Sequence, residues 1–226
     1  LSHLTTVLIA SASASAFLLA AASVAPLGVA AGMSIVYVFS TAVFSVAGRG
    51  LWQHGPALLF LNLSLALLLS RRERLVPWAG LTLGLMVACR LPTLPLAVLL
   101  ALHVARNERR SAIRFALLAA VPATALLAYS RLALGSFAAL GQLQAFRPVP
   151  GGAALGVLGL LFSPSRGLLV FGPIFLFAIP GLLRTPGPTR ARPVLFWASL
   201  FAPALVLITG LWPVWWGGHA FGYRLL

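Results

Sequence analysis

The sequence predicts an all-α protein, a polytopic transmembrane helical bundle. Hydrophobic residues make up 61% of the 226 residues, charged residues make up 8%, and the mean hydropathy is +1.02. The apolar residues form long runs, as helices that cross a bilayer require. Most of the sixteen cationic residues, all of them arginine, lie in short clusters between these runs. We expect one transmembrane domain over residues 1–226.

The arginine clusters predict the orientation of the chain in the membrane. Lys and Arg accumulate in the cytoplasmic loops of membrane proteins, so each cluster marks a cytoplasmic loop. The clusters are Arg71, Arg72 and Arg74; Arg106, Arg109, Arg110 and Arg114; and Arg184, Arg190 and Arg192. A net charge of +14 would otherwise suggest nucleic-acid binding, but these arginines separate apolar runs and form no basic stripe, so we expect no nucleic-acid partner.

The apolar segments differ in length, and length decides which of them we expect to cross. A crossing helix needs about 20 residues, and rarely fewer than about 17. We expect about six crossings, at 4–22, 28–46, 56–70, 113–132, 166–183 and 193–211. The segment 56–70 is the shortest of these. The first segment has no basic stretch before it and contains Ala and Ser repeats, which favours a membrane helix with a close neighbour over a signal peptide.

Three further segments are too short to cross. The pair 75–89 and 92–105 is separated by Arg90 and Pro92 and has an arginine cluster at each outer end. This arrangement favours two short helices that enter the membrane and return, or a strongly kinked pair. The segment 153–162 is expected to be an interfacial helix on the non-cytoplasmic side.

This topology brings three loops, 47–55, 135–166 and 212–226, to the outer face. They carry the residues that we single out as candidate substrate contacts: Arg49, Trp52, Gln53, His54, Arg166, Trp215, Trp216, His219 and Arg224. Arginine binds phosphate oxygens in a bidentate manner, and aromatic rings cover the apolar face of a sugar. A lipid-linked phosphosugar offers both groups.

Each of these residues also has a structural interpretation. Tryptophans anchor many membrane proteins at the interface, and Arg166 suits a lipid headgroup as well as a substrate phosphate. His54 is open to proton transfer, to binding a hydroxyl group, or to a plain hydrogen bond at the surface. Arg90 lies among apolar residues, where a charge is costly unless it is solvated or paired, and structural and functional roles are both open to it.

The motifs as a set resemble the GT-C superfamily of bacterial polytopic glycosyltransferases, relatives of protein O-mannosyltransferases and aminoarabinose transferases. The resemblance covers about residues 45–226, and its motifs lie at 49–56, 80–92, 161–168 and 215–224. It implies transfer of a sugar from a polyprenyl-phosphate-linked donor to an acceptor on the outer face of the bacterial plasma (inner) membrane. The donor and the lipid bilayer are then the expected partners.

The sequence departs from the family on the catalytic base. The resemblance implies an acidic residue in the first outer loop, but the chain has no Asp, and Glu73 and Glu108 lie within the arginine clusters. We therefore expect a fragment that is truncated at both ends, inactive by itself, with the base upstream of residue 1. One outer carboxylate at most would be a poor magnesium site, so we expect no metal and no cofactor.

Two other classes of protein remain open. A transporter or flippase for an amphipathic lipid-linked substrate would also use arginines, tryptophans and broken helices. A non-catalytic membrane subunit would use the same loops as an interface. Cys89, the single cysteine, excludes an intramolecular disulfide and a cysteine-based zinc cluster within this sequence.

Overall fold

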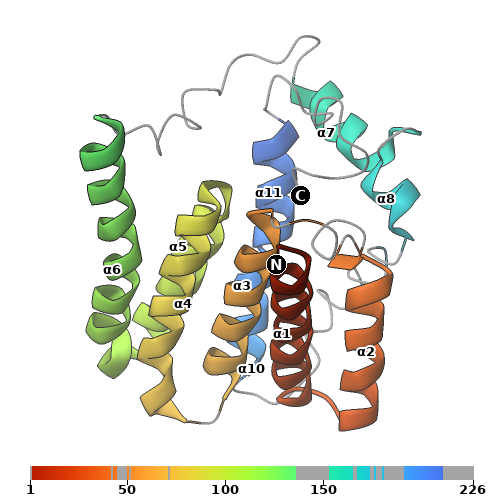
Figure 1. Cartoon of the computed structure of the whole chain (residues 1–226). Helices are drawn as coiled ribbons and strands as arrows, with labels where there is room; N and C mark the ends of the chain where they lie inside the picture. Colours follow the sequence, from red (N-terminus) through yellow and green to blue (C-terminus); the bar gives the residue numbers. More distant parts are fainter. Residues whose placement is uncertain are drawn as a thin grey trace.

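The computed structural model describes residues 2–41, 43–44, 50, 52–70, 72–135, 153–164, 167–173, 176, 180 and 191–210. These residues form helices and no strand, which confirms the all-α prediction (Figure 1). The helices are α1 (Ser2–Ala22), α2 (Leu27–Phe39), α3 (His54–Leu69), α4 (Val76–Cys89), α5 (Leu94–Asn107), α6 (Arg109–Leu134), α7 (Ala153–Phe162), α8 (Leu168–Phe171), α10 (Ala191–Ser199) and α11 (Phe201–Gly210).

The helices α4, α5 and α6 alternate in direction. Gly80 and Gly84 of α4 face Phe115 and Ala119 of α6 in the same order, so these two helices run parallel. Because α5 joins the end of α4 to the start of α6, it must run in the opposite direction to both. The segments 75–89 and 92–105 are therefore two helices of opposite direction joined by a turn, and their entry into a membrane stays a prediction.

Proline and glycine set the ends of these helices. Pro77 and Pro95 lie in the first turns of α4 and α5, where a helix leaves N–H groups without internal partners and the missing proline N–H costs nothing. Gly135 ends α6 in the left-handed conformation, with φ of 67°. Arg131 donates from Nη1 to the Gly135 carbonyl at 2.6 Å, and so satisfies an oxygen beyond the last turn.

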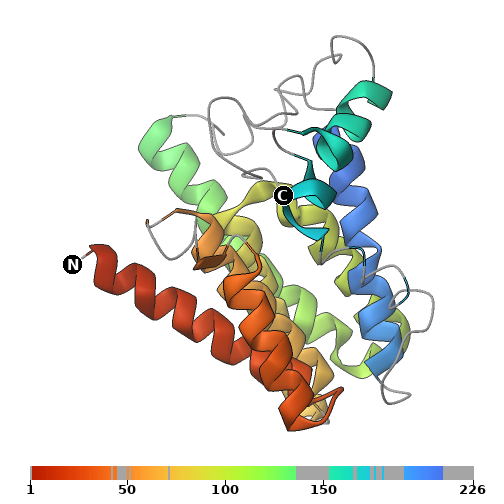
Figure 2. The same ribbon diagram turned by 90° about the vertical axis from the view of Figure 1, so that its right-hand side faces the viewer.

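The bundle has two distinct ends, which follow from the helix directions (Figure 1). The arginine end holds the α3–α4 linker, the α5–α6 junction and the start of α10, with the described members of the three clusters: Arg72, Arg74, Arg106, Arg109, Arg110, Arg114 and Arg192. The loop end holds the start of α3, the α4–α5 turn, the end of α6, α7 and the end of α11. In Figure 2, α10 and α11 follow one another from the first of these ends to the second.

The core lies between α3, α4, α5, α6 and α10. Its fully buried side chains include Leu83 and Met86 of α4, Leu100 and Val104 of α5, and Phe115 of α6. Glycines allow the closest contacts: a Cβ on Gly80 would collide with the Phe115 carbonyl oxygen, and one on Gly84 with that of Ala119. Small residues at these positions allow two helix backbones to approach, as in membrane helix pairs.

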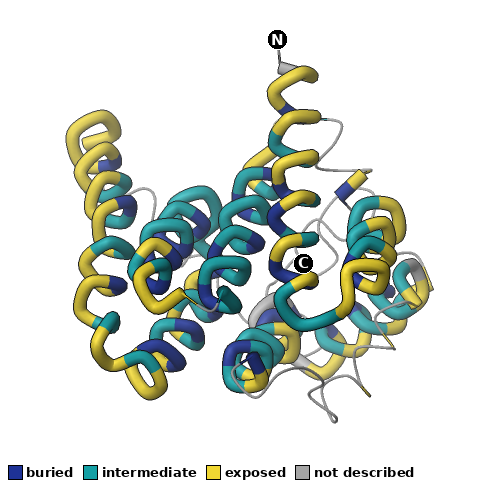
Figure 3. The backbone as a smooth tube through the Cα atoms, turned by 90° about the horizontal axis from the view of Figure 1, so that it is seen from below, coloured by how far each residue is buried: buried dark blue, intermediate teal, exposed yellow. Residues whose placement is uncertain are grey.

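The outward faces of the peripheral helices are apolar. Exposed side chains along α6 include Ile113, Leu117, Val121 and Leu132, and α1 exposes Leu4 and Leu8. Figure 3 shows these helices exposed on the side away from the bundle. Within the described ranges, His3–Ala22 and Arg109–Leu134 are the two helices that are both long and apolar enough to cross a membrane.

Several predicted segments are shorter in the structure. Helix α2 ends at Phe39, not near 46, and the polar pair Ser40 and Thr41 follows it. The Thr41 hydroxyl bonds back to the Tyr37 carbonyl, a local bond that competes with the helical one. The segment 193–211 is two helices, because Pro203 has no N–H to donate to the Ser199 carbonyl four residues earlier.

The two remaining segments have different outcomes. The predicted interfacial helix at 153–162 is α7 with the same bounds, although its position relative to a membrane stays a prediction. Half of the predicted crossing at 166–183 lies outside the described residues. Within it, α8 covers only Leu168–Phe171 and ends at Gly172.

Candidate functional site

Three of the predicted substrate contacts lie within the described residues. Trp52, Gln53 and His54 form the entry to α3 at the loop end of the bundle. The other six lie outside the described residues: Arg49, Arg166, Trp215, Trp216, His219 and Arg224. The site can therefore be described only at its first loop.

The backbone before α3 folds back on itself and fixes Trp52. The Trp52 N–H donates to the Gly50 carbonyl at 2.7 Å, and the Gly55 N–H donates to the Trp52 carbonyl at 3.2 Å. The indole lies over Gly50, since a Cβ on Gly50 would be 2.7 Å from the indole Nε1. Glycine at position 50 thus makes room for the ring. Trp52 is 49% exposed.

His54 is the first residue of α3, and its side chain is half-buried. Pro56 follows within the first turn, where it loses no helical hydrogen bond. Gln53 precedes the helix and is exposed, and its carbonyl accepts from the Ala57 N–H at 3.2 Å. An indole, an amide and an imidazole thus follow one another at a helix entry, a set that suits contact with a ring and its hydroxyl groups.

The described flanks of the other two predicted loops lie at the same end as Trp52. Helix α6 ends there at Leu134, and α11 ends there at Gly210, packed against Gly156 of α7. A Cβ on Gly156 would collide with the Gly210 carbonyl oxygen, so α7 and α11 are in direct contact. The prediction that the three loops lie on one face requires this arrangement of the described residues. The side of the membrane that this end faces stays a prediction.

Arg90 also lies at the loop end, in the turn between α4 and α5. Its backbone is extended, with φ of −150° and ψ of 100°, and it ends α4. Thr93 closes the turn, because its N–H and its hydroxyl both donate to the Arg90 carbonyl, at 3.1 and 2.7 Å. The half-buried Arg90 side chain therefore lies at the tip of the helical hairpin, and not halfway along a helix.

A buried polar network was missed by sequence reasoning. The Asn62 amide of α3 donates to the Ser13 hydroxyl of α1 at 3.0 Å and to the Tyr37 hydroxyl of α2 at 3.0 Å. The Ser13 and Tyr37 hydroxyls are themselves 2.9 Å apart. The signal was present in the sequence, since Asn62 is the one amide side chain in the apolar run 56–70.

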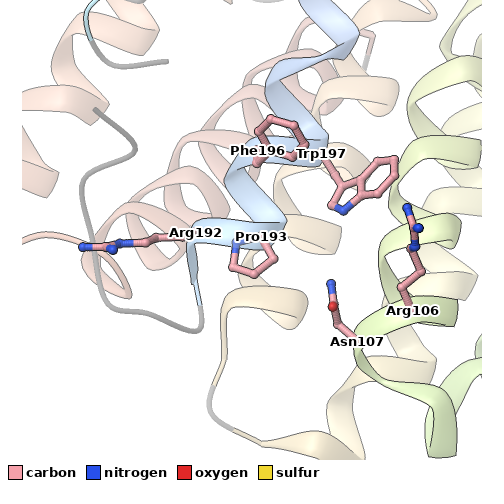
Figure 4. Close-up of a pocket in the computed structure, with 6 residues that line it drawn as sticks. All are labelled: Arg106, Asn107, Arg192, Pro193, Phe196 and Trp197. Carbon is pink, nitrogen blue, oxygen red and sulfur yellow. The ribbon is translucent and has the colours of Figure 1, made fainter. Parts of the chain in front are cut away.

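A cavity at the arginine end was also missed. It has a volume of about 420 Å³ and is lined by residues of α5 and α10 (Figure 4). The lining consists of Arg106, Asn107, Arg192, Pro193, Phe196 and Trp197. Sequence reasoning assigned Arg106 and Arg192 to topology alone, because nothing in the sequence brings the two clusters together.

Among the described residues, the carboxylates and the potential metal ligands form neither a catalytic group beside Trp52 nor a metal site. Glu73 lies in the α3–α4 linker and Glu108 at the α5–α6 junction, so both carboxylates are at the arginine end, away from Trp52. Across the part of the chain that the structure describes, no group of three His, Cys, Asp or Glu side chains is arranged to hold a metal.

Comparison with models of known families, with curated proteins and with solved structures finds no match for this chain. The family resemblance of the motifs therefore stays a prediction. The helix entry at Trp52–His54 and the arginine clusters lie at opposite ends of the bundle.

Proposed function

We propose that this chain belongs to a membrane glycosyltransferase that moves a sugar from a polyprenyl-phosphate donor to an acceptor on the outer face of the bacterial inner membrane. The observation that carries the proposal is the exposed Trp52, followed by Gln53 and His54, at the end of the bundle opposite the arginine clusters. A sugar-binding group and a cytoplasmic anchor would then lie on opposite sides of one membrane.

The membrane placement has its own support. The exposed residues of α1 and α6 form apolar faces, such as Ile113, Leu117 and Val121 of α6, that water would solvate poorly. The described arginines of all three clusters gather at one end, as the positive-inside rule requires of cytoplasmic loops. We propose about six crossings in all, of which α1 and α6 have the required length by themselves.

The proposed reaction is a displacement at the anomeric carbon of the sugar. An acceptor oxygen attacks this carbon, the bond from the carbon to the phosphate oxygen breaks, and the polyprenyl phosphate leaves with the electron pair. The acceptor's proton passes to a carboxylate base, a role that we do not assign to Glu73 or Glu108 because both lie at the arginine end. Arg166 and Arg224 would stabilise the charge that grows on the leaving phosphate.

The residues at the entry to α3 would hold the sugar. The exposed indole of Trp52 suits stacking on a sugar ring or on the prenyl chain, as do the indoles of Trp215 and Trp216. Gln53 and His54 would bond sugar hydroxyls. Arg49 and His219 complete the proposed contacts from the first and third loops.

The test is transfer by the full-length protein in liposomes, with undecaprenyl-phosphate-linked mannose, glucose and aminoarabinose as donors and outer-membrane material as acceptor. Release of undecaprenyl phosphate is the readout, because every donor yields it. We expect release with one of these donors. Movement of the intact lipid across the membrane without release would identify a transporter instead. If folded protein gives neither release nor movement of the lipid, both the transferase and the transporter proposals are contradicted.

Trp52 has a matched control that separates a sugar contact from an interface anchor. Trp78 in the first turn of α4 is similarly exposed, at 52% against 49%, but lies at the arginine end. We expect Trp52→Ala to lower transfer about two- to tenfold and Trp78→Ala to leave it near wild type, since stacking on a ring is worth about 0.5–1.5 kcal/mol. Equal losses in the two variants would mean that both tryptophans are anchors.

A further inference from the structure

The cavity between α5 and α10 brings together two arginine clusters that are far apart in the sequence. Arg106 and Asn107 come from the last turn of α5, and Arg192 and Pro193 from the first turn of α10. Figure 4 shows Arg106, Asn107, Pro193 and Trp197 around one space, while the Arg192 side chain points away from it. Residues from two separate arginine clusters therefore meet at one opening, and Arg106 is the cation that faces it.

Arg106 is held in place at this cavity. Its guanidinium carbon lies 5.9 Å from the centre of the Trp197 ring, within the distance of a cation–π contact. The contact places the positive charge of Arg106 beside the Trp197 ring at the edge of the cavity. The neighbouring Asn107 is fixed as well, because its Nδ2 is hydrogen-bonded to His103 Nδ1 at 2.8 Å.

The surroundings of Arg106 are apolar on the side toward the middle of the bundle. Val98 and Leu102 precede Arg106 by eight and four residues on α5, so the three share one face of the helix, and the two apolar side chains are 49% and 46% exposed. Across the cavity, Phe196 of α10 is 49% exposed. A cation thus lies at the end of an exposed apolar strip, an arrangement that matches an anionic head on a hydrocarbon chain.

We propose that this cavity binds the phosphate headgroup of an anionic phospholipid. The Arg106 guanidinium would donate to the phosphate oxygens, the fixed Asn107 amide would bond the same headgroup, and the acyl chains would lie along Val98, Leu102 and Phe196. A free phosphate would use the cation but not the apolar strip. The inference depends on the membrane placement proposed above and not on the transferase activity.

The test measures which lipid the purified protein retains in detergent, by native mass spectrometry. The probes are phosphatidylglycerol and phosphatidylcholine with identical acyl chains. We expect wild-type protein to prefer phosphatidylglycerol, and Arg106→Gln to reduce this preference about tenfold, because a hydrogen bond to a charged group is lost. Arg106→Lys should reduce it less, since it keeps the charge and loses the planar fork.

Arg74→Gln is the matched control. Arg74 is exposed at the same end and carries the same charge, but it lies in the α3–α4 linker and does not line the cavity. Equal losses from Arg74→Gln and Arg106→Gln would reduce the effect to general charge attraction and overturn the proposal, as would an unchanged preference in Arg106→Gln. Displacement of phosphatidylglycerol by excess inorganic phosphate would make the site one for free anions.

Two features keep this experiment independent of the transferase proposal and of folding. Lipid retention needs neither donor nor acceptor, so a failure of the lipid experiment would leave the transferase proposal unaffected. A failure of the transfer assay would likewise leave the lipid site unaffected. Arg106 is exposed, so its replacement removes no core side chain. Unchanged thermal unfolding of Arg106→Gln in detergent verifies this point, and charge reversal in Arg106→Glu provides a second variant that should abolish the preference.

Discussion

Asn62 of α3 donates its side-chain amide to both the backbone carbonyl and the hydroxyl of Ser13 on α1, at 3.2 and 3.0 Å. The Asn62 side chain is 3% exposed, and the Tyr37 hydroxyl of α2 accepts from the same nitrogen. One amide therefore connects the first three helices. These helices share few large core side chains, so the network fixes how they are aligned along their length.

We expect Asn62→Ala to destabilise the protein. The change removes three hydrogen bonds between helices and leaves the Ser13 carbonyl with its helical bond only. An interhelical hydrogen bond in a membrane protein contributes about 0.6 kcal/mol on average, so we expect the loss of this network to lower the free energy of unfolding by about 1–2 kcal/mol. The measurement is unfolding in mixed micelles of increasing SDS content.

Ser34→Ala is the control for this loss. Among the described residues, the Ser34 hydroxyl bonds to the Ala30 carbonyl of its own helix and makes no connection to another helix. We expect a change near zero. If Ser34→Ala and Asn62→Ala unfold at the same SDS content, the network contributes nothing to the alignment of the helices.

The contact between α4 and α6 gives a second prediction. A Cβ added to Gly84 would collide with the Ala119 carbonyl oxygen and come within 3.1 Å of the Pro122 ring, and neither is a flexible side chain. Gly84→Ala should therefore separate the two helices and cost about 1–3 kcal/mol, as overpacking does elsewhere. Unfolding in mixed micelles measures the cost.

Gly28→Ala provides the comparison within the same protein. Gly28 lies in α2 and has no atom within 4 Å of an added Cβ. Because alanine is the better helix former, we expect this change to stabilise the protein by about 0.5–1 kcal/mol. A destabilisation of similar size in both variants would indicate that glycine matters for helix flexibility and not for the close contact.

The separation of the two ends predicts the topology in cells. Reporter fusions after Arg74, Arg110 and Arg190 should give a cytoplasmic signal, and fusions near His54, Arg147 and Gly218 should give an outer one. The described parts of the chain that flank these positions lie at the corresponding ends of the bundle. A cytoplasmic signal at Gly218 would remove the third loop from the proposed site.

The sequence predicted the helices best where apolar composition and proline agree. The hairpin of α4 and α5 was expected because Arg90 and Pro92 interrupt two short apolar runs, and α7 has the expected bounds. The C-terminal end of α2 and the break before α11 were missed. Both depend on local competition for backbone carbonyls, by the Thr41 hydroxyl and by Pro203, which hydrophobic pattern alone does not register.

The polar contacts were harder to predict than the helices. The partners of Asn62 are 25 and 49 residues away, and only the packing of α1 and α2 against α3 brings them together. The cavity at Arg106 likewise depends on α10 packing against α5. Of the candidate site, the first loop can be examined in the structure, and its position at the loop end agrees with the topology derived from the arginine clusters.

Arg166 offers the sharpest test of the proposed reaction, because a phosphate contact and a headgroup anchor make different demands on it. An anchor needs only a positive charge on a long side chain, so lysine should replace it. A bidentate contact to the leaving phosphate needs the planar guanidinium, and lysine cannot supply it. The loss of one hydrogen bond to a charged group corresponds to about ten- to a hundredfold in transfer efficiency.

The measurement is release of undecaprenyl phosphate by full-length Arg166→Lys and Arg166→Ala proteins at matched expression. Glu73→Gln is the control, since Glu73 lies at the arginine end, and we expect it to transfer at the wild-type rate. Similar losses in both Arg166 variants, with Glu73→Gln unaffected, would support the phosphate contact. Wild-type transfer by Arg166→Lys would instead assign this arginine to the membrane interface and leave the leaving group to Arg224 or to another cation.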